Sequence, residues 1–217
     1  MHFRINRTSF IYGATFAIFA NARLLSVGIA DFEKSGEFPE RTVVREDNES
    51  THFSKDGSSK SEESKYHFDM VRPGCSLYGI NPTPYMKNPM QNVVYLTSKI
   101  LQIRHIDRDS TVGYGAEGFA KKGSTLATIA FGYADGCMRS VSGRGFCAID
   151  GVKFPVVGRV SMDLIVIDIT KCKKKVTVGD EVEIIGNVVT VDDFANFAGT
   201  IGYEIITRLG SRVTRVY

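Results

Sequence analysis

The sequence predicts a mainly β protein, a small β-barrel or sandwich-like domain with one or two short helices, preceded by a largely disordered N-terminal segment. Val- and Ile-rich segments recur after residue 93 at intervals of roughly ten residues, separated by Gly or Asp, as in a sandwich or small barrel. Residues 31–65 are rich in Ser, Glu, Asp and Lys, and such a stretch buries too little apolar surface to offset its ordering entropy. With 217 residues, the chain has room for one domain and an appendage.

The expected strands and helix follow one another along the second half of the chain. They cover residues 93–106, 124–134, 145–158, 161–169, 176–186 and 187–198. Asp150-Gly151 predicts a type I′ hairpin turn between two strands. In the last segment, Thr190 or Asp192 can cap a helix. Its apolar residues share one face: Phe194, Phe197 and Ala198.

The first residues have the layout of a secretory signal. Arg4 and Arg7 precede an apolar run over residues 10–20, and Ala20-Asn21-Ala22 has the form of a cleavage site. The run is too short to span a bilayer. The alternatives are a short buried helix or strand, or a terminus without selected structure. We therefore expect a cytoplasmic protein without a membrane span, or an exported one if the first 22 residues act as a signal peptide.

Charge and cysteine spacing argue against several classes of function. The net charge is only +3, and the basic run at residues 171–175 precedes a Val-rich segment, which is typical of a solvated turn. We therefore expect no nucleic-acid partner. The four cysteines form no C-x-x-C pair, which argues against a structural zinc site and a disulfide framework. The expectation is reduced thiols and no bound metal.

Five motifs stand in one order between residue 66 and the C-terminus. They read YHFDMVRPGCSLYGI, VGYGAEG, FGYADG, VGRVSMD and GTIGYEIITRLGSRVTRVY. This ordered set resembles the C-terminal part of alanine racemase, which interconverts L- and D-alanine, a peptidoglycan precursor, through a pyridoxal-phosphate aldimine. The resemblance implies a leader or linker at 1–65, a remnant of the end of a (β/α)₈ barrel at 66–87, and the family's C-terminal β domain at 88–217.

The resemblance implies that Tyr114, in the GYG motif, is one of two catalytic bases. Racemisation needs two bases, because the α-proton leaves one face of a planar centre and returns to the other. A phenol ordinarily titrates near ~10, so it acts as a base only where neighbouring cations or donors favour phenolate. Flanking glycines would let the side chain reach a site formed with another domain or subunit. On the residues alone, Tyr114 is an aromatic in a Gly-rich turn.

Four positions match the family's cofactor ligands. Arg72 matches the arginine that faces the pyridine nitrogen, and because a guanidinium does not donate its proton, the ring stays unprotonated and transamination is suppressed. Gly74 and Cys75 match positions whose N–H groups bind the cofactor phosphate, and Tyr203 matches the tyrosine whose hydroxyl contacts it. Without the family, Arg72 is more often a surface charge and Tyr203 a half-buried core aromatic.

Three further positions match the family's substrate site. Met162 matches the residue whose N–H meets the substrate carboxylate, whereas Tyr133 and Asp163 match residues that line the substrate entrance. In the family, Tyr114, Tyr133 and Met162 act across a dimer interface, which implies a homodimer or a partner barrel chain. On the residues alone, Met162 would belong to the core, and Asp163, like Asp135-Gly136, to a turn.

The chain departs from the family at the cofactor lysine. The family carries that lysine in a barrel motif of the form K-A-N-A-Y-G, which does not occur in this sequence. Without it, the chain alone is not expected to racemise at family rates. We therefore expect a truncated alanine racemase that is inactive alone. Two alternatives stay open: a subunit that completes a site with a separate barrel chain, and a non-catalytic β-barrel binding module.

Overall fold

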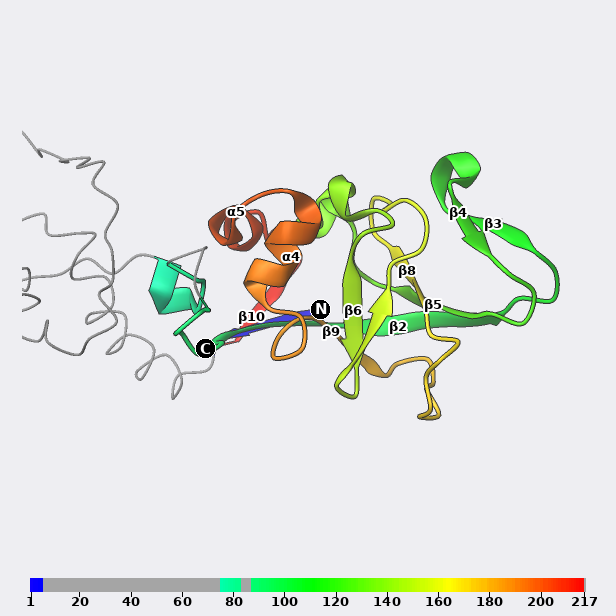
Figure 1. Ribbon diagram of the computed structural model, residues 1–217, viewed down its shortest axis with the longest axis horizontal. Coiled ribbons are helices and arrows are strands. Elements are labelled where there is room, and N and C mark those ends of the chain that lie inside the picture. Colours follow the sequence, from blue (N-terminus) through cyan, green and yellow to red (C-terminus); the bar gives the residue numbers. More distant parts are fainter. Residues whose placement is uncertain (6–74, 83–86, 217) are drawn as a thin grey trace, which may run out of the picture.

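The computed structural model describes residues 1–5, 75–82 and 87–216. Within these ranges the chain is mainly β with two α-helices (Figure 1), which confirms the predicted fold class. The strands are β1 (His2–Ile5), β2 (Val94–His105), β3 (Ser110–Val112), β4 (Gly118–Ala120), β5 (Thr125–Ile129), β6 (Phe146–Ile149), β7 (Val152–Pro155), β8 (Ile165–Asp168), β9 (Glu181–Ile185) and β10 (Thr214–Val216). The helices are α4 (Val191–Ala198) and α5 (Gly202–Thr207), with short 3-10 turns η2 (Cys75–Tyr78), η3 (Tyr114–Ala116), η4 (Tyr133–Asp135) and η5 (Arg139–Val141).

One long strand, β2, connects two groups of strands. Its first half pairs with β1 and β9, and its second half pairs with β5. The larger path runs β10-β1-β2-β9-β6-β7, with β5 joining β2 to β8, and β3 and β4 form a separate hairpin. The register of β2 shifts after Leu96 and again after Ile100. Such irregularities bend a strand, which lets one strand serve both groups.

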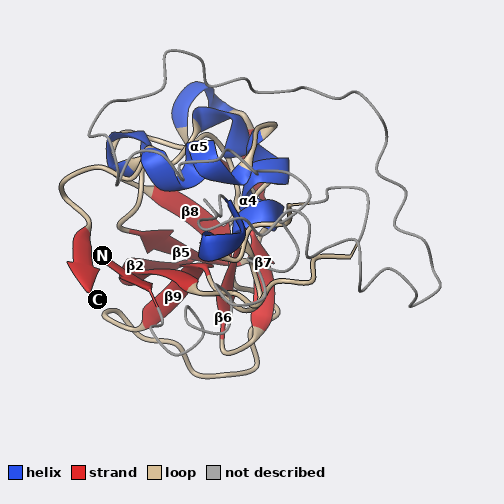
Figure 2. Ribbon diagram, turned by 90° about the vertical axis from the view of Figure 1, so that its left-hand side faces the viewer, coloured by secondary structure: helices blue, strands red, loops and turns tan. Residues whose placement is uncertain are grey.

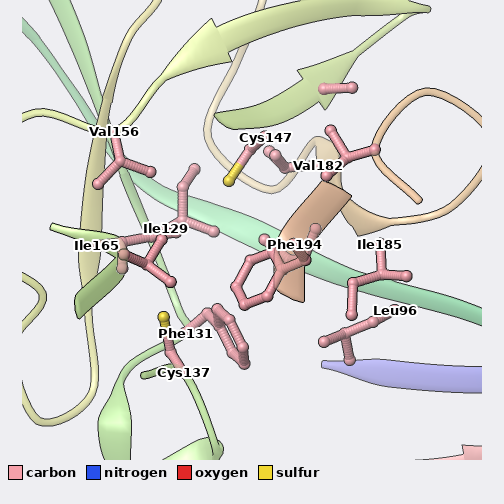
Figure 3. Packing of buried hydrophobic residues seen from close by; sticks show 14 of the residues in the cluster. Leu96, Ile129, Phe131, Cys137, Cys147, Val156, Ile165, Val182, Ile185 and Phe194 are labelled. Atoms are coloured by element: carbon pink, nitrogen blue, oxygen red, sulfur yellow. The ribbon is translucent and has the colours of Figure 1, made fainter. Parts of the chain in front are cut away.

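The core lies between these strands and helix α4. Leu96 on β2 is paired in register with Ile185 on β9, and both side chains are fully buried. Phe194 of α4 packs against Phe131, with ring centroids 6.3 Å apart (Figure 3). The helices gather on one side of the strands (Figure 2).

Two local predictions are confirmed at residue level. Ile149 pairs with Val152, and the two residues between them, Asp150 and Gly151, have φ values of 51° and 78°, as a type I′ turn requires. Helix α4 begins after Thr190. The Thr190 hydroxyl accepts the Asp193 N–H at 3.0 Å, and the Asp193 carboxylate accepts the Thr190 N–H at 3.2 Å, which is a complete capping box.

Asp192, the other candidate cap, has a different role in the structure. Its carboxylate accepts the Asn81 N–H at 3.0 Å and the Asn88 side-chain N–H at 3.1 Å. Burial is the main cause that raises the pKa of Asp192 above its ordinary value. Asp192 therefore ties the segment after η2 to the first turn of α4.

The structure has a strand at the start of the chain, within the segment for which a short buried helix or strand was one of the alternatives to a signal. β1 pairs antiparallel with β2 and parallel with β10, and Phe3 is buried in the main core. Residues 6–65, which contain the rest of the expected leader and the signal-like segment, lie outside the described residues. Their expected lack of structure stays a prediction.

Two surface features complete the fold. The lysine run occupies the loop between β8 and β9, where all four lysines are exposed and Lys174 lies 3.6 Å from Asp150, so the predicted solvated turn is confirmed. None of the helices in the described part of the chain has the length and apolar character needed to cross a membrane.

Candidate functional site

The turn that carries Tyr114 has an unusual backbone. It connects β3 to β4, and φ is positive at Gly113 (79°), Gly115 (69°) and Ala116 (55°). Glycine adopts these angles without strain, whereas an L-residue such as Ala116 does so at a cost of about 1–2 kcal/mol. The left-handed turn leaves the Tyr114 side chain 60% exposed. Tyr114 is therefore presented outward rather than packed in the core.

This turn rests on the backbone of residues 158–159. A Cβ added at Gly118 would lie 2.5 Å from the Gly158 Cα, so the two chain segments are in direct contact. The Arg159 guanidinium forms a two-point ion pair with Glu117. That ion pair adds a side-chain connection between the turn and residue 159 to their backbone contact.

The turn η4, which carries Tyr133, rests on the same segment three residues further along. The Tyr133 N–H donates to the Ser161 carbonyl at 3.0 Å, and the Ala134 N–H donates to the Met162 carbonyl at 2.9 Å. Tyr133 is 44% and Met162 52% exposed. Methionine as a residue type suggests a place in the core. The exposure of Met162 shows that it does not belong to the core.

The two aspartates near this segment share one cation. Arg212 Nη2 lies 2.8 Å from Asp135 Oδ1, and Arg212 Nη1 lies 2.7 Å from Asp163 Oδ1. Asp135 is buried, and its Oδ2 accepts the Gly132 N–H at 2.9 Å. The hydrogen bond to Asp163, followed by the charge of Asp135, raises the pKa of Arg212. Asp135 therefore has a structural role beyond an ordinary turn residue.

The candidate phosphate ligands lie on a different part of the fold. Cys75 begins η2 and Tyr203 lies in the first turn of α5. The Tyr78 and Tyr203 rings meet edge to face, with centroids 6.3 Å apart. Burial, followed by the charges of Cys75 and Tyr78, raises the pKa of Tyr203. The structure thus brings Cys75 and Tyr203 together, whereas Arg72 and Gly74 lie outside the described residues.

A hollow of about 390 Å³ lies beside the Tyr114 turn. Its lining residues are Glu117, Arg139, Ser140, Ser142, Arg144 and Arg159. Three arginines and a single glutamate line it, so the hollow carries an excess of positive charge and attracts anions. The sequence does not predict this hollow, because its arginines come from separate segments. Of these arginines, only Arg159 lies inside one of the five motifs, as the third residue of VGRVSMD.

The candidate residues therefore form two groups. Tyr114, Tyr133, Met162 and Asp163 gather along residues 158–163, whereas Cys75 and Tyr203 lie at η2 and α5. Figure 1 shows α5 and the β3–β4 hairpin at opposite ends of the domain. Among the described residues, no group of three or more His, Cys, Asp or Glu side chains is placed to hold a metal ion.

Comparisons with known proteins match this architecture. A family model described as "Alanine racemase, C-terminal domain" matches residues 93–217. The chain is 47% identical to alanine racemase of Rickettsia bellii over 154 residues, which cover 70% of this chain and 38% of that protein. It is 49% identical to the catabolic alanine racemase of Mesorhizobium japonicum, also over 154 residues, covering 70% and 40% respectively.

Solved structures give the same result. Alanine racemase from Bartonella henselae with covalently bound pyridoxal phosphate superposes with a TM-score of 0.66 and 42% identity, over 71% of this chain and 43% of that chain. For alanine racemase from Acinetobacter baumannii the TM-score is 0.64 with 42% identity, over 70% and 43%.

The fold and the matched region define a racemase-type β domain. The chain belongs to the alanine racemase family through its C-terminal domain. It spans about two fifths of the length of the curated relatives cited above.

Proposed function

We propose that this chain supplies the β-domain part of an alanine racemase site, in which Tyr114 exchanges a proton with the substrate. The observation that carries this proposal is the left-handed turn at residues 113–116, which presents Tyr114 at 60% exposure. Backbone strain, which in this turn falls on Ala116, concentrates at functional sites. An aromatic of the core would be buried instead, and Tyr114 is not.

Substrate binding is proposed for the segment on which the Tyr114 turn rests. No acceptor among the described residues takes the Met162 N–H, so this donor is available to a substrate carboxylate. The adjacent hollow with Arg139 and Arg159 favours an anionic group approaching from that side. Tyr133 and Asp163 would border the entrance, and Tyr114 would exchange the α-proton of the amino acid held there.

Pyridoxal phosphate fits the second group of residues. The Tyr203 hydroxyl and the start of η2 at Cys75 lie together, and a hydroxyl with backbone N–H groups is a suitable donor set for a phosphate. When bound, the cofactor supplies the electron sink that makes the α-proton of an amino acid acidic. We propose that Gly74 assists at the phosphate and that Arg72 faces the ring nitrogen, which a guanidinium leaves unprotonated.

We propose that a complete site requires a second chain. Figure 1 shows the β3–β4 hairpin, whose turn carries Tyr114, and helix α5, which carries Tyr203, at opposite ends of the domain, so one copy does not bring Tyr114 to its own Tyr203. A homodimer or a separate barrel chain would join them, and the barrel chain would also supply the lysine that acts as the second base. On this proposal the chain alone does not racemise alanine.

A mixing experiment tests the proposal. The full chain is combined with pyridoxal phosphate, L-alanine and the part of the Rickettsia bellii racemase outside the region matched here, and D-alanine formation is measured. The mixture is expected to be active and the chain alone inactive. Tyr114→Phe should lower kcat by at least about 100-fold. Tyr95→Phe is the matched control, because among the described residues its hydroxyl bonds only Asn187, at 3.0 Å, and it should match the unsubstituted chain.

Three outcomes would contradict parts of this proposal. Equal rates for Tyr114→Phe and Tyr95→Phe would remove Tyr114 from proton transfer. Borohydride-reducible attachment of pyridoxal phosphate to the chain alone would show that it holds a cofactor lysine of its own. Inactivity of every mixture would favour the non-catalytic binding module.

A further inference from the structure

Arg212 lies in the last of the five motifs and has no role in the proposed proton transfer. Its two Nη atoms bond carboxylates from two different loops, Asp135 at 2.8 Å and Asp163 at 2.7 Å. A guanidinium is planar and holds its N–H groups in a rigid fork. Arg212 therefore fixes the spacing between the two carboxylates and offsets part of their combined negative charge.

The two loops joined in this way carry Tyr133 and Met162. Asp135 ends the η4 turn, which begins at Tyr133, and Asp163 follows Met162 directly. Two backbone hydrogen bonds, from Tyr133 to Ser161 and from Ala134 to Met162, hold the loops together. The Arg212 guanidinium connects the same two loops through side chains, by its bonds to Asp135 and Asp163.

Asp135, the buried one of the two aspartates, depends on Arg212 for a cationic partner. Asp135 is only 4% exposed, and a buried carboxylate is costly without a cationic or hydrogen-bonding partner. Its other oxygen accepts the Gly132 N–H, and its carbonyl accepts the Gly210 N–H at 3.1 Å. Asp135 thus joins the start of the η4 turn to the C-terminal segment, and Arg212 supplies its only cation among the described residues.

We propose that Arg212 is a positioning residue that sets the spacing of the Tyr133 turn against the Met162 loop. It touches neither substrate nor cofactor and acts through the two aspartates. Its consequence for racemisation rests on the proposed function, whereas its hold on the loops does not. Loosening the fork should let Tyr133 and Met162 move relative to each other and weaken binding of the substrate carboxylate.

Amide hydrogen exchange of the full chain tests the hold on the loops. The Tyr133 and Ala134 amides report on it, because both donate across the two loops. In Arg212→Met their exchange should accelerate by about tenfold or more relative to the core amide of Ile129. Normalising to this core amide separates local loosening from global unfolding.

Arg208→Met is the matched control. Arg208 is also a half-exposed C-terminal arginine bonded to a carboxylate, Glu204 at 2.8 Å, but its guanidinium bonds this residue of α5 instead of joining the two loops. In the Arg208→Met variant, the amides of Tyr133 and Ala134 should exchange as in the unsubstituted chain. Arg212→Lys, which keeps the charge without the fork, should give an intermediate acceleration and serves if Arg212→Met does not fold. Equal normalised exchange in all of these chains would overturn the proposal.

Kinetics in the mixture with the barrel part provide a second readout. Arg212→Lys should raise the KM for alanine about fivefold to tenfold while kcat stays within about twofold. A purely stabilising role would instead lower the amount of active protein, and so the apparent kcat, at unchanged KM. That second pattern would overturn the proposal. An inactive unsubstituted mixture would refute the proposed function, and the exchange experiment would still decide the role of Arg212.

Discussion

Gly113 and Arg159 are in such close backbone contact that a Cβ on residue 113 would lie 2.9 Å from the backbone nitrogen of Arg159. Gly113 also has a φ of 79°. Two independent constraints, the left-handed backbone and the lack of space, therefore act on the residue before Tyr114. Together they explain why glycine precedes the tyrosine.

The two constraints are separable by experiment. Gly123 also has a positive φ, 89°, but nothing lies within 4 Å of its added Cβ. Gly123→Ala should lower the free energy of unfolding by about 1–2 kcal/mol through backbone strain alone. Gly113→Ala should lose a further 1–3 kcal/mol or so through overpacking. Urea denaturation measures both, and equal losses would show that the contact with Arg159 yields at no cost.

The helix cap gives a second prediction. Thr190→Ala removes the acceptor of the Asp193 N–H and should lower the free energy of unfolding by about 1 kcal/mol. Thr190→Ser keeps the hydroxyl and should restore most of that loss. Thermal or urea unfolding of both variants is the measurement. A serine variant as unstable as the alanine variant would mean that the threonine methyl group, not the cap, stabilises this position.

Local features of this fold are readable from sequence, because their signals lie within a few residues. The Asp150-Gly151 turn and the Thr190 cap each depend on the type of one or two neighbouring residues. The exposed Tyr114 turn is of the same kind, since its flanking glycines permit the left-handed backbone. For such features, residue type and spacing are sufficient.

Features that join distant segments were not predictable in this way. Nothing in residues 2–5 indicates that they pair with both β2 and β10. Likewise, Arg212 bonds two aspartates that lie 28 positions apart in the printed numbering, Asp135 and Asp163, and only the folded chain brings them together. The exposure of Met162 is also a property of the loop rather than of the residue type.

The N-terminal strand leads to a third prediction. Phe3 is 5% exposed and belongs to the main core, so Phe3→Ala should lower the free energy of unfolding by about 3 kcal/mol. His2→Ala, an exposed neighbour on the same strand, should change it by less than about 0.5 kcal/mol. Comparing the two by urea denaturation tests the packing of β1. Similar small effects would show that β1 contributes little to the core.

Thiol reactivity is expected to divide the four cysteines into two pairs. Burial raises the pKa of Cys147 to about 12 and strongly raises that of Cys137. Since the thiolate is the reactive form, both should resist iodoacetamide at pH 8 in the folded chain. Cys172 and Cys75 are partly exposed and should react, Cys75 more slowly because burial raises its pKa. Peptide mass spectrometry reads out the result, with urea-unfolded protein as the fully labelled control. Rapid labelling of Cys147 would contradict its burial.

Acid sensitivity should depend in part on Glu204 in the first turn of α5. The Thr200 hydroxyl donates to its carboxylate, and Arg208 Nε donates at 2.9 Å. The Thr200 hydrogen bond, followed by that of Arg208, lowers the pKa of Glu204. A carboxyl whose pKa is lower in the folded state stabilises the fold above its unfolded pKa, about 4.3 for glutamate. That contribution disappears as the pH falls through the folded-state pKa.

Glu204→Gln removes this titration, so the stability lost between pH 7 and pH 3 should be smaller in the variant than in the unsubstituted chain. Urea midpoints at pH 7, 4 and 3 measure the difference. Thr200→Ala removes the principal cause of the lowered pKa, and in its background Glu204→Gln should change the acid dependence less. Parallel stability curves for the unsubstituted chain and Glu204→Gln would show that the bonds to Thr200 and Arg208 do not favour the charged carboxylate.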